Sequence, residues 1–156
     1  MKRTAFFLSL LLFFSTIAKA QNSTLRTHEF NTDKNHLAIL GYDPVSYFTT
    51  GKAEKGKKEF SVVADGITYQ FSSAKNKELF KNNYTRYEPQ YGGWCAYAMG
   101  AKGEKVEIDP DTFKIIDGKL YLFYNAFFNN TLKSWNKDEA ALKQKADKNW
   151  EKIFHN

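Results

Sequence analysis

The sequence predicts an α+β domain: a small, mainly antiparallel sheet built from two hairpins and covered by several helices, including a C-terminal amphipathic helix. Two β-rich stretches are each interrupted by an Asp-Gly pair, at residues 65–66 and 117–118. Asp-Gly favours a two-residue hairpin because a type I′ turn needs positive φ at both central positions. The third observation is a helical period of apolar residues over 138–154, with lysines on the other faces. Hairpins and helices in separate segments are typical of the α+β class.

Residues 1–20 have the pattern of a signal peptide. Lys2 and Arg3 precede a mostly apolar run over 6–17, and the Ala-Lys-Ala that follows is an A-x-A cleavage site. The run is shorter than the ~20 residues that a membrane-spanning helix needs. We therefore expect an exported mature chain that begins at Gln21, periplasmic or secreted from a bacterium, with no stable membrane anchor.

Charge and cysteine content limit the possible functions. The full chain carries a formal net charge of +6, and the predicted signal peptide contributes Lys2, Arg3 and Lys19 without an acidic residue, which leaves +3. For an exported domain this value indicates solubility, and we expect no nucleic-acid partner. The single cysteine, Cys95, rules out an intramolecular disulfide. An unpaired cysteine in an exported protein is buried, reactive, metal-bound or paired with another molecule.

The first elements precede the hairpins. Residues 21–36 are polar, and we expect an irregular lead-in to a domain over 37–156. The apolar run at 37–41 ends in glycine, which predicts a short buried strand. Asp43 is placed to cap a short helix, because Pro44 suits the first helical position, where no backbone N–H is needed.

The first predicted hairpin pairs 59–64 with 67–71. Apolar residues alternate along these strands, so one face of the hairpin should be buried. Ser72 or Ser73 then caps a helix that ends near Asn83.

The second predicted hairpin pairs 112–116 with 119–124. Residues 126–135 have a helical pattern, and the last helix covers 138–154. The apolar stripe of this last helix consists of Leu142, Ala146, Trp150 and Ile153.

The stretch around which the chain is organised is 91–99, which reads Tyr-Gly-Gly-Trp-Cys-Ala-Tyr-Ala-Met. If the glycines end a loop and a helix begins at Trp94, Cys95 lies in the first turn, where unpaired N–H groups and the helix dipole favour a thiolate. Met99 follows four residues later and would share a helix face with Cys95, giving two soft sulfur donors. The alternative is that both sulfurs are core, since free cysteine is often buried and methionine fills gaps. Candidate cofactor-binding residues around this sulfur are Tyr91, Gly92, Gly93, Trp94 and Tyr97.

The order of motifs resembles the YHS domain family in its exported, single-cysteine branch. The matching stretches are Leu40–Phe48, Tyr69–Ser73, Leu79–Tyr87, Gln90–Ala96, Asp117–Leu122 and Asn149–Trp150. Metal-handling YHS domains carry cysteines at three positions that correspond here to Ser46, Ser72 and Asn76, so the resemblance implies no cysteine metal site at these residues. Some similar proteins are selenoproteins, which favours a reactive or metal-binding sulfur at Cys95 over a buried filler.

Three functional interpretations follow. The first is a binding protein for a soft metal ion such as Cu(I), with Cys95 and Met99 as ligands, because thiolate and thioether suit Cu(I). The second is a thiol-based redox enzyme with Cys95 as the catalytic thiolate, which would need an external small thiol because the chain has no resolving cysteine. The third is a non-catalytic partner-binding module in which Cys95 is buried; the sequence does not identify the protein partner.

Overall fold

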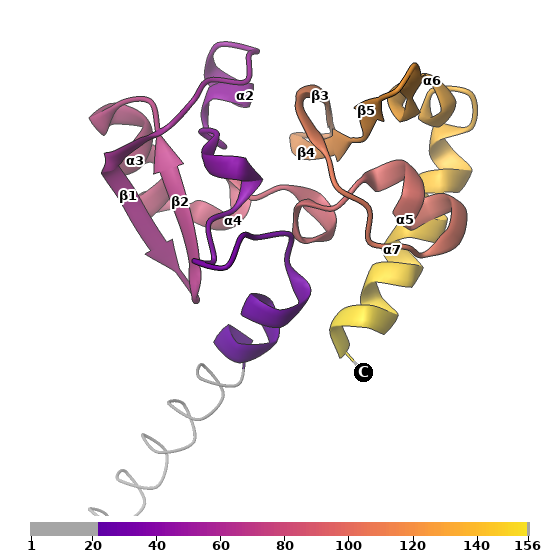
Figure 1. Ribbon diagram of the computed structural model, residues 1–156, viewed down its shortest axis with the longest axis horizontal. Helices are drawn as coiled ribbons and strands as arrows, with labels where there is room; N and C mark the ends of the chain where they lie inside the picture. Colours follow the sequence, from indigo (N-terminus) through magenta and orange to yellow (C-terminus); the bar gives the residue numbers. More distant parts are fainter. Residues whose placement is uncertain (1–21, 156) are drawn as a thin grey trace, which may run out of the picture.

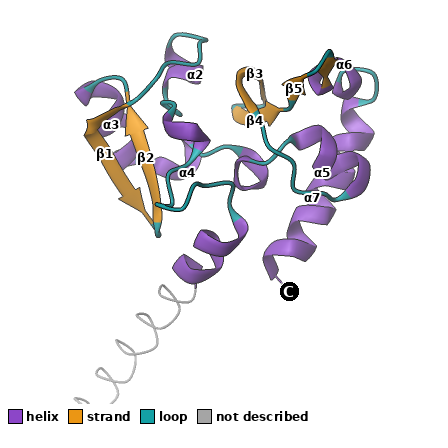
Figure 2. Cartoon of the chain, viewed as in Figure 1, coloured by secondary structure: helices purple, strands orange, loops and turns teal. Residues whose placement is uncertain are grey.

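The computed structural model describes residues 22–155 and has the predicted α+β architecture (Figure 1). Its hairpins form three separate two-stranded antiparallel sheets, where the sequence predicted one small sheet. The predicted signal peptide and its cleavage site lie outside these residues. Among the described helices, none combines the length and the apolar character that crossing a membrane requires. Strands and helices alternate along the chain in small units, which Figure 2 distinguishes by colour.

Both predicted Asp-Gly hairpins are confirmed. β1 (Lys57–Ala64) pairs antiparallel with β2 (Ile67–Phe71), and β3 (Asp109–Ile116) pairs antiparallel with β4 (Lys119–Phe123). Both residues of each Asp-Gly turn have positive φ, between 43° and 86°. This is the backbone conformation that a type I′ turn requires.

The helices fill the space around and between the hairpins. Besides the helical segment at residues 22–29, they are η1 (Ile39–Gly41), α2 (Ser46–Thr49), α3 (Ala74–Asn82), α4 (Tyr84–Tyr87), η2 (Gln90–Gly93), α5 (Ala96–Lys102), α6 (Thr131–Trp135) and α7 (Glu139–His155). The Ser73 side chain accepts a hydrogen bond from the Asn76 N–H and caps α3, as one of the two predicted alternatives had it. The predicted C-terminal helix is confirmed as α7, with Ala146 fully buried.

Three sequence-based predictions are wrong. Residues 22–29 are helical and not irregular, and Arg26 anchors them to the domain through a buried ion pair with Glu88. Residues 37–41 form no strand but end in η1, where three successive residues have positive φ. The predicted helix over 126–135 is confirmed only from Thr131 onward. Before it lies a third small hairpin, β5 (Asn125–Ala126) paired with β6 (Asn129–Asn130).

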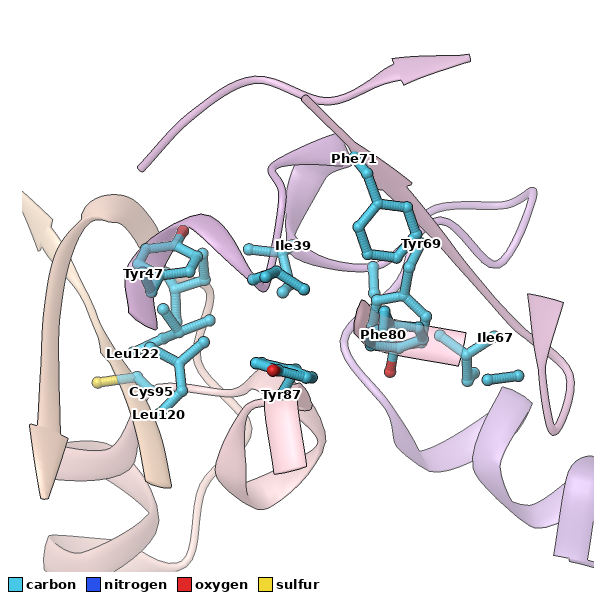
Figure 3. Packing of buried hydrophobic residues seen from close by; sticks show 14 residues of the cluster. Ile39, Tyr47, Ile67, Tyr69, Phe71, Phe80, Tyr87, Cys95, Leu120 and Leu122 are labelled. Atoms are coloured by element: carbon cyan, nitrogen blue, oxygen red, sulfur yellow. The ribbon is translucent and has the colours of Figure 1, made fainter. Parts of the chain in front are cut away.

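The core consists of two clusters that meet at β4. Leu120 and Leu122 belong to the first cluster, whereas Tyr121 and Phe123 belong to the second. This division follows from the strand period of two, because successive side chains point to opposite faces. Figure 3 shows side chains of both hairpins in the first cluster, with Tyr87 between them. The first cluster therefore joins the two hairpins.

Burial and neighbouring carboxylates raise the pKa of several tyrosines. Burial is the largest cause at Tyr47, Tyr69 and Tyr91, and it raises the pKa of Tyr121 to about 12. At Tyr84 the largest cause is a hydrogen bond to Asp65, which raises its pKa to about 12. These phenols are neutral in the fold at a pH where an unfolded tyrosine, with a pKa of 10.0, already ionises.

An alkaline titration should therefore unfold the protein cooperatively. A pKa that is higher in the folded state contributes stability that is present below pH 10 and is lost as the pH rises through the folded value. We expect stability to fall between pH 10 and about 12, with the phenolate absorbance of these tyrosines rising in one step with the loss of circular dichroism. Gradual phenolate formation with native circular dichroism retained would contradict this expectation.

Candidate functional site

The glycine pair before Cys95 is required by the backbone. Tyr91, Gly92 and Gly93 all have positive φ, at 56°, 59° and 86°. A Cβ atom on Gly92 would lie 2.7 Å from the Trp150 ring and 2.9 Å from the Phe30 ring. The turn is thus explained by the close packing of Gly92 against Trp150 of α7 and against Phe30, which follows the N-terminal helical segment.

Cys95 is the N-cap residue of α5, close to its predicted place at a helix N-terminus. Its backbone N–H donates to the Val106 carbonyl at 2.9 Å, and its side chain is fully buried. Figure 3 shows the sulfur at the edge of the first cluster, directed away from the other labelled side chains. The thiol therefore faces a boundary of the core and not its centre.

Both hydrogen-bonding functions of the thiol are used. The Tyr124 backbone N–H donates to Cys95 Sγ at 3.3 Å, and Sγ lies 3.4 Å from Thr131 Oγ1. The Thr131 hydroxyl donates its own proton to the Tyr124 carbonyl at 2.8 Å. Its oxygen is consequently free to accept from the thiol, so the neutral S–H form completes the network. Tyr124 and Thr131 flank the β5–β6 hairpin, and the sulfur contacts both ends of this hairpin.

Cys95 also lies in the wall of a surface depression of about 300 Å³. Tyr97, Tyr124 and Thr131 share this wall, and Lys102 and Asn129 lie on it as well. Only Tyr97 among the predicted cofactor-binding residues is found here.

The other predicted site residues lie elsewhere. Met99 is fully buried in the second cluster, whereas Cys95 belongs to the first. The Tyr91 hydroxyl donates to Asp147 at 2.8 Å, and Trp94 Nε1 donates to the Glu29 carbonyl at 2.7 Å. These predicted residues therefore line no common pocket with the thiol.

Gly92 and Gly93, the remaining predicted cofactor-binding residues, do not line the depression beside Cys95 either. Gly92 lines a separate depression of about 390 Å³ beside Trp150, and the Gly93 carbonyl accepts a hydrogen bond from the Asn31 side chain. Within residues 22–155 no three histidine, cysteine or acidic side chains are grouped so that they could hold a metal ion.

A group of polar side chains and N–H groups surrounds the buried carboxylate of Asp43. The sequence did not predict this group. Asp43 Oδ1 accepts from the backbone N–H groups of Val45 and Ser46, at 2.8 and 3.3 Å. Its Oδ2 accepts from the N–H and hydroxyl of Ser72, both at 2.8 Å, and from Asn76 Nδ2 at 2.7 Å. The only sequence signal was the helix cap at Asp43; the contacts with Ser72 and Asn76 depend on tertiary packing.

These contacts place Ser46, Ser72 and Asn76 around one carboxylate. The Ser46 hydroxyl lies 2.8 Å from the carbonyl oxygens of both Asp43 and Lys52, so it is held internally as well. The three positions that the resemblance assigns to metal-binding cysteines are thus neighbours in space. Here their polar groups are occupied by hydrogen bonds within the protein.

Comparisons with known proteins add no relative. No protein-family model matches the chain, and neither a curated protein nor a solved structure matches it.

Proposed function

We propose that the chain is an exported, YHS-like binding module without catalytic activity, in which Cys95 is a structural thiol. The observation that carries this proposal is the enclosure of the sulfur at the base of the β5–β6 hairpin. Tyr124 and Thr131 use its acceptor and donor functions, and the side chain has no exposed surface. A thiol in this position holds the hairpin against α5.

The YHS-like character is supported by the environment of Asp43. Ser46, from the segment that follows Asp43, meets Ser72 and Asn76 there, at the three positions where metal-handling YHS domains carry cysteines. Since their side chains bond the carboxylate or nearby carbonyls, this centre serves the fold.

A second candidate function is soft-metal binding or thiol chemistry at Cys95, and one observation favours it. Cys95 and Lys102 both line the 300 Å³ depression, and the Tyr124 N–H that donates to the sulfur would also stabilise a thiolate. Cu(I) would then bind Cys95 with a ligand from outside the described site, because Met99 packs in the other cluster.

Thiol accessibility tests the proposal. We expect native protein to react with iodoacetamide at least about 100-fold more slowly than denatured protein, because a buried thiol reacts only after local opening. Intact mass should show one adduct after denaturation and none for Cys95→Ser. Cu(I) should leave the native rate unchanged in both the wild type and Met99→Leu.

The opposite results support the second candidate. Rapid alkylation of native protein, with protection by Cu(I), would show that the thiol is a reactive site and that the structural role is wrong. Protection retained in Met99→Leu would agree with a second ligand from outside the site. Loss of protection would instead identify Met99 as that ligand in spite of its place in the other cluster, since the exchange nearly conserves side-chain volume.

A further inference from the structure

The β5–β6 hairpin presents two bare phenylalanine rings to solvent. Asn125 pairs with Asn130 and Ala126 with Asn129, so Phe127 and Phe128 form the two-residue turn. Their exposed fractions are 91% and 112%, the highest among the exposed large apolar residues described. Adjacent, fully exposed aromatic residues at a tip need an explanation that packing within this chain does not supply.

The turn also holds these residues in a costly backbone conformation. Phe127 and Phe128 have φ values of 50° and 65°, in the left-handed region that favours Gly, Asn or Asp. Asparagines are present in the neighbouring strands, at positions where positive φ is not needed. The sequence thus places bulky rings at the outermost point of the hairpin in spite of the strain, and such strain is concentrated at functional sites.

The base of the same hairpin is firmly anchored. Asn125 Nδ2 donates to Thr112 Oγ1 of β3 at 3.0 Å, and the Asn130 side chain caps α6. The Thr131 N–H donates to the Tyr124 carbonyl at 3.0 Å, and Cys95 Sγ contacts both of these residues. A rigid base therefore supports the two exposed rings.

The rings are too small a surface for a stable protein interface. Two phenylalanines bury about 150–250 Å² each, whereas a stable interface buries about 800 Å² on each partner. The other exposed large apolar residues, Leu40 and Val63, lie in η1 and β1 and do not extend the patch. A lipid surface needs no matching shape and accepts aromatic side chains at the depth of the headgroups.

We propose that Phe127 and Phe128 insert into the interface of a lipid bilayer and dock the domain reversibly on a membrane. This inference rests on the proposed binding function and names its partner. The asparagines beside the rings are uncharged, so they can enter the headgroup region without desolvating an ion. β5 and α6 lie at the end of the molecule opposite the helical segment at residues 22–29 and the C-terminal end of α7 (Figure 1), so docking leaves these two segments away from the bilayer. Binding should be weaker than the roughly 10⁴ M⁻¹ of one myristoyl chain.

The test is co-sedimentation with vesicles of phosphatidylethanolamine and phosphatidylglycerol at millimolar lipid. Replacing the turn by Phe127→Asn with Phe128→Gly should lower the partition coefficient at least about tenfold, since burying one phenylalanine is worth that factor or more. The same change should raise Tm by about 3–8 °C, because Asn-Gly relieves the left-handed strain. All variants keep the same N-terminus, so any contribution of residues 1–21 cancels in the comparison.

Leu40→Asn is the matched control. Leu40 is also exposed and has a φ of 53°, so the exchange removes apolar surface and strain at a distant site. Its partition coefficient should stay within about twofold of the wild type. Equal vesicle binding by the wild type and the Asn-Gly variant, or no binding by either, would overturn the membrane proposal.

A wild-type dimer in sedimentation that dissociates in the Asn-Gly variant would overturn it too, and would make a second copy the partner. A membrane test that fails leaves the thiol test of the proposed function unaffected, because alkylation of Cys95 does not depend on vesicles.

Discussion

Replacing Asp43 with alanine is expected to lower the free energy of unfolding by about 3–5 kcal/mol. The variant removes a fully buried carboxylate and leaves the N–H groups of Val45 and Ser72 and the Asn76 amide without their acceptor. Each unsatisfied buried donor costs on the order of 1–3 kcal/mol, and partial relaxation keeps the sum below simple addition. The carboxylate links the start of α2, the end of β2 and the first turn of α3, so the loss should affect the whole domain.

Urea denaturation with a two-state fit gives the measurement. Asp43→Asn should cost less than alanine, about 2–3 kcal/mol, because one acceptor oxygen remains while the amide N–H₂ faces donors. Asp111→Ala is the control, since Asp111 is exposed, and it should change stability by less than about 0.5 kcal/mol. If Asp43→Ala lowered the free energy of unfolding by less than about 1 kcal/mol, its effect would be close to that of an exposed substitution. The carboxylate would then not be the contact that links α2, β2 and α3.

The hairpins were predictable because their information is local. The residue types of Asp65-Gly66 and Asp117-Gly118 fix the turn, and the alternation of apolar residues fixes the buried face. Helix α7 was predictable for a similar reason, since one continuous apolar stripe spans it.

The elements that were wrongly predicted depend on tertiary contacts. No residue type near Ile39 and Leu40 indicates that they have positive φ. The short apolar run therefore predicted a strand that the structure does not have. The Phe127-Phe128 turn lacks the usual turn residues, so the sequence predicted that the helix of α6 begins earlier, at residue 126. The polar stretch 22–29 is held on the domain as a helix by a contact of Arg26 with Glu88, which lies 62 positions away.

The candidate site shows the same division. The position of Cys95 at the start of a helix followed from the Gly-Gly pair and the periodicity after it. The partners of its sulfur did not, because Tyr124 and Thr131 come from a hairpin that the sequence did not indicate. An i, i+4 spacing also proved insufficient to bring two sulfurs together: Cys95 precedes the first helical residue, and its side chain packs in a different cluster from Met99.

Replacing Arg26 with methionine is expected to lower the free energy of unfolding by about 3–5 kcal/mol, because it leaves the Glu88 carboxylate buried without a cation. Glu88 is 8% exposed, and its remaining partner is the Tyr69 hydroxyl at 2.7 Å. Burial opposes the charge of Arg26, but its hydrogen bond with Glu88 and the charge of that residue outweigh burial and raise the Arg26 pKa. The guanidinium also lies 4.4 Å from the centre of the Phe30 ring. Limited proteolysis should therefore release the 22–29 segment first.

A double-mutant cycle with Glu88→Gln separates charge from packing. The double variant should be about 1–3 kcal/mol more stable than Arg26→Met alone, because a neutral glutamine still accepts from Tyr69 and leaves no uncompensated charge. Lys81→Met is the control: its pair with Glu78, at 3.1 Å, is half-exposed and should contribute less than about 0.5 kcal/mol. Strictly additive effects of the two substitutions would mean that Arg26 stabilises the segment by packing on Phe30 and not by neutralising Glu88.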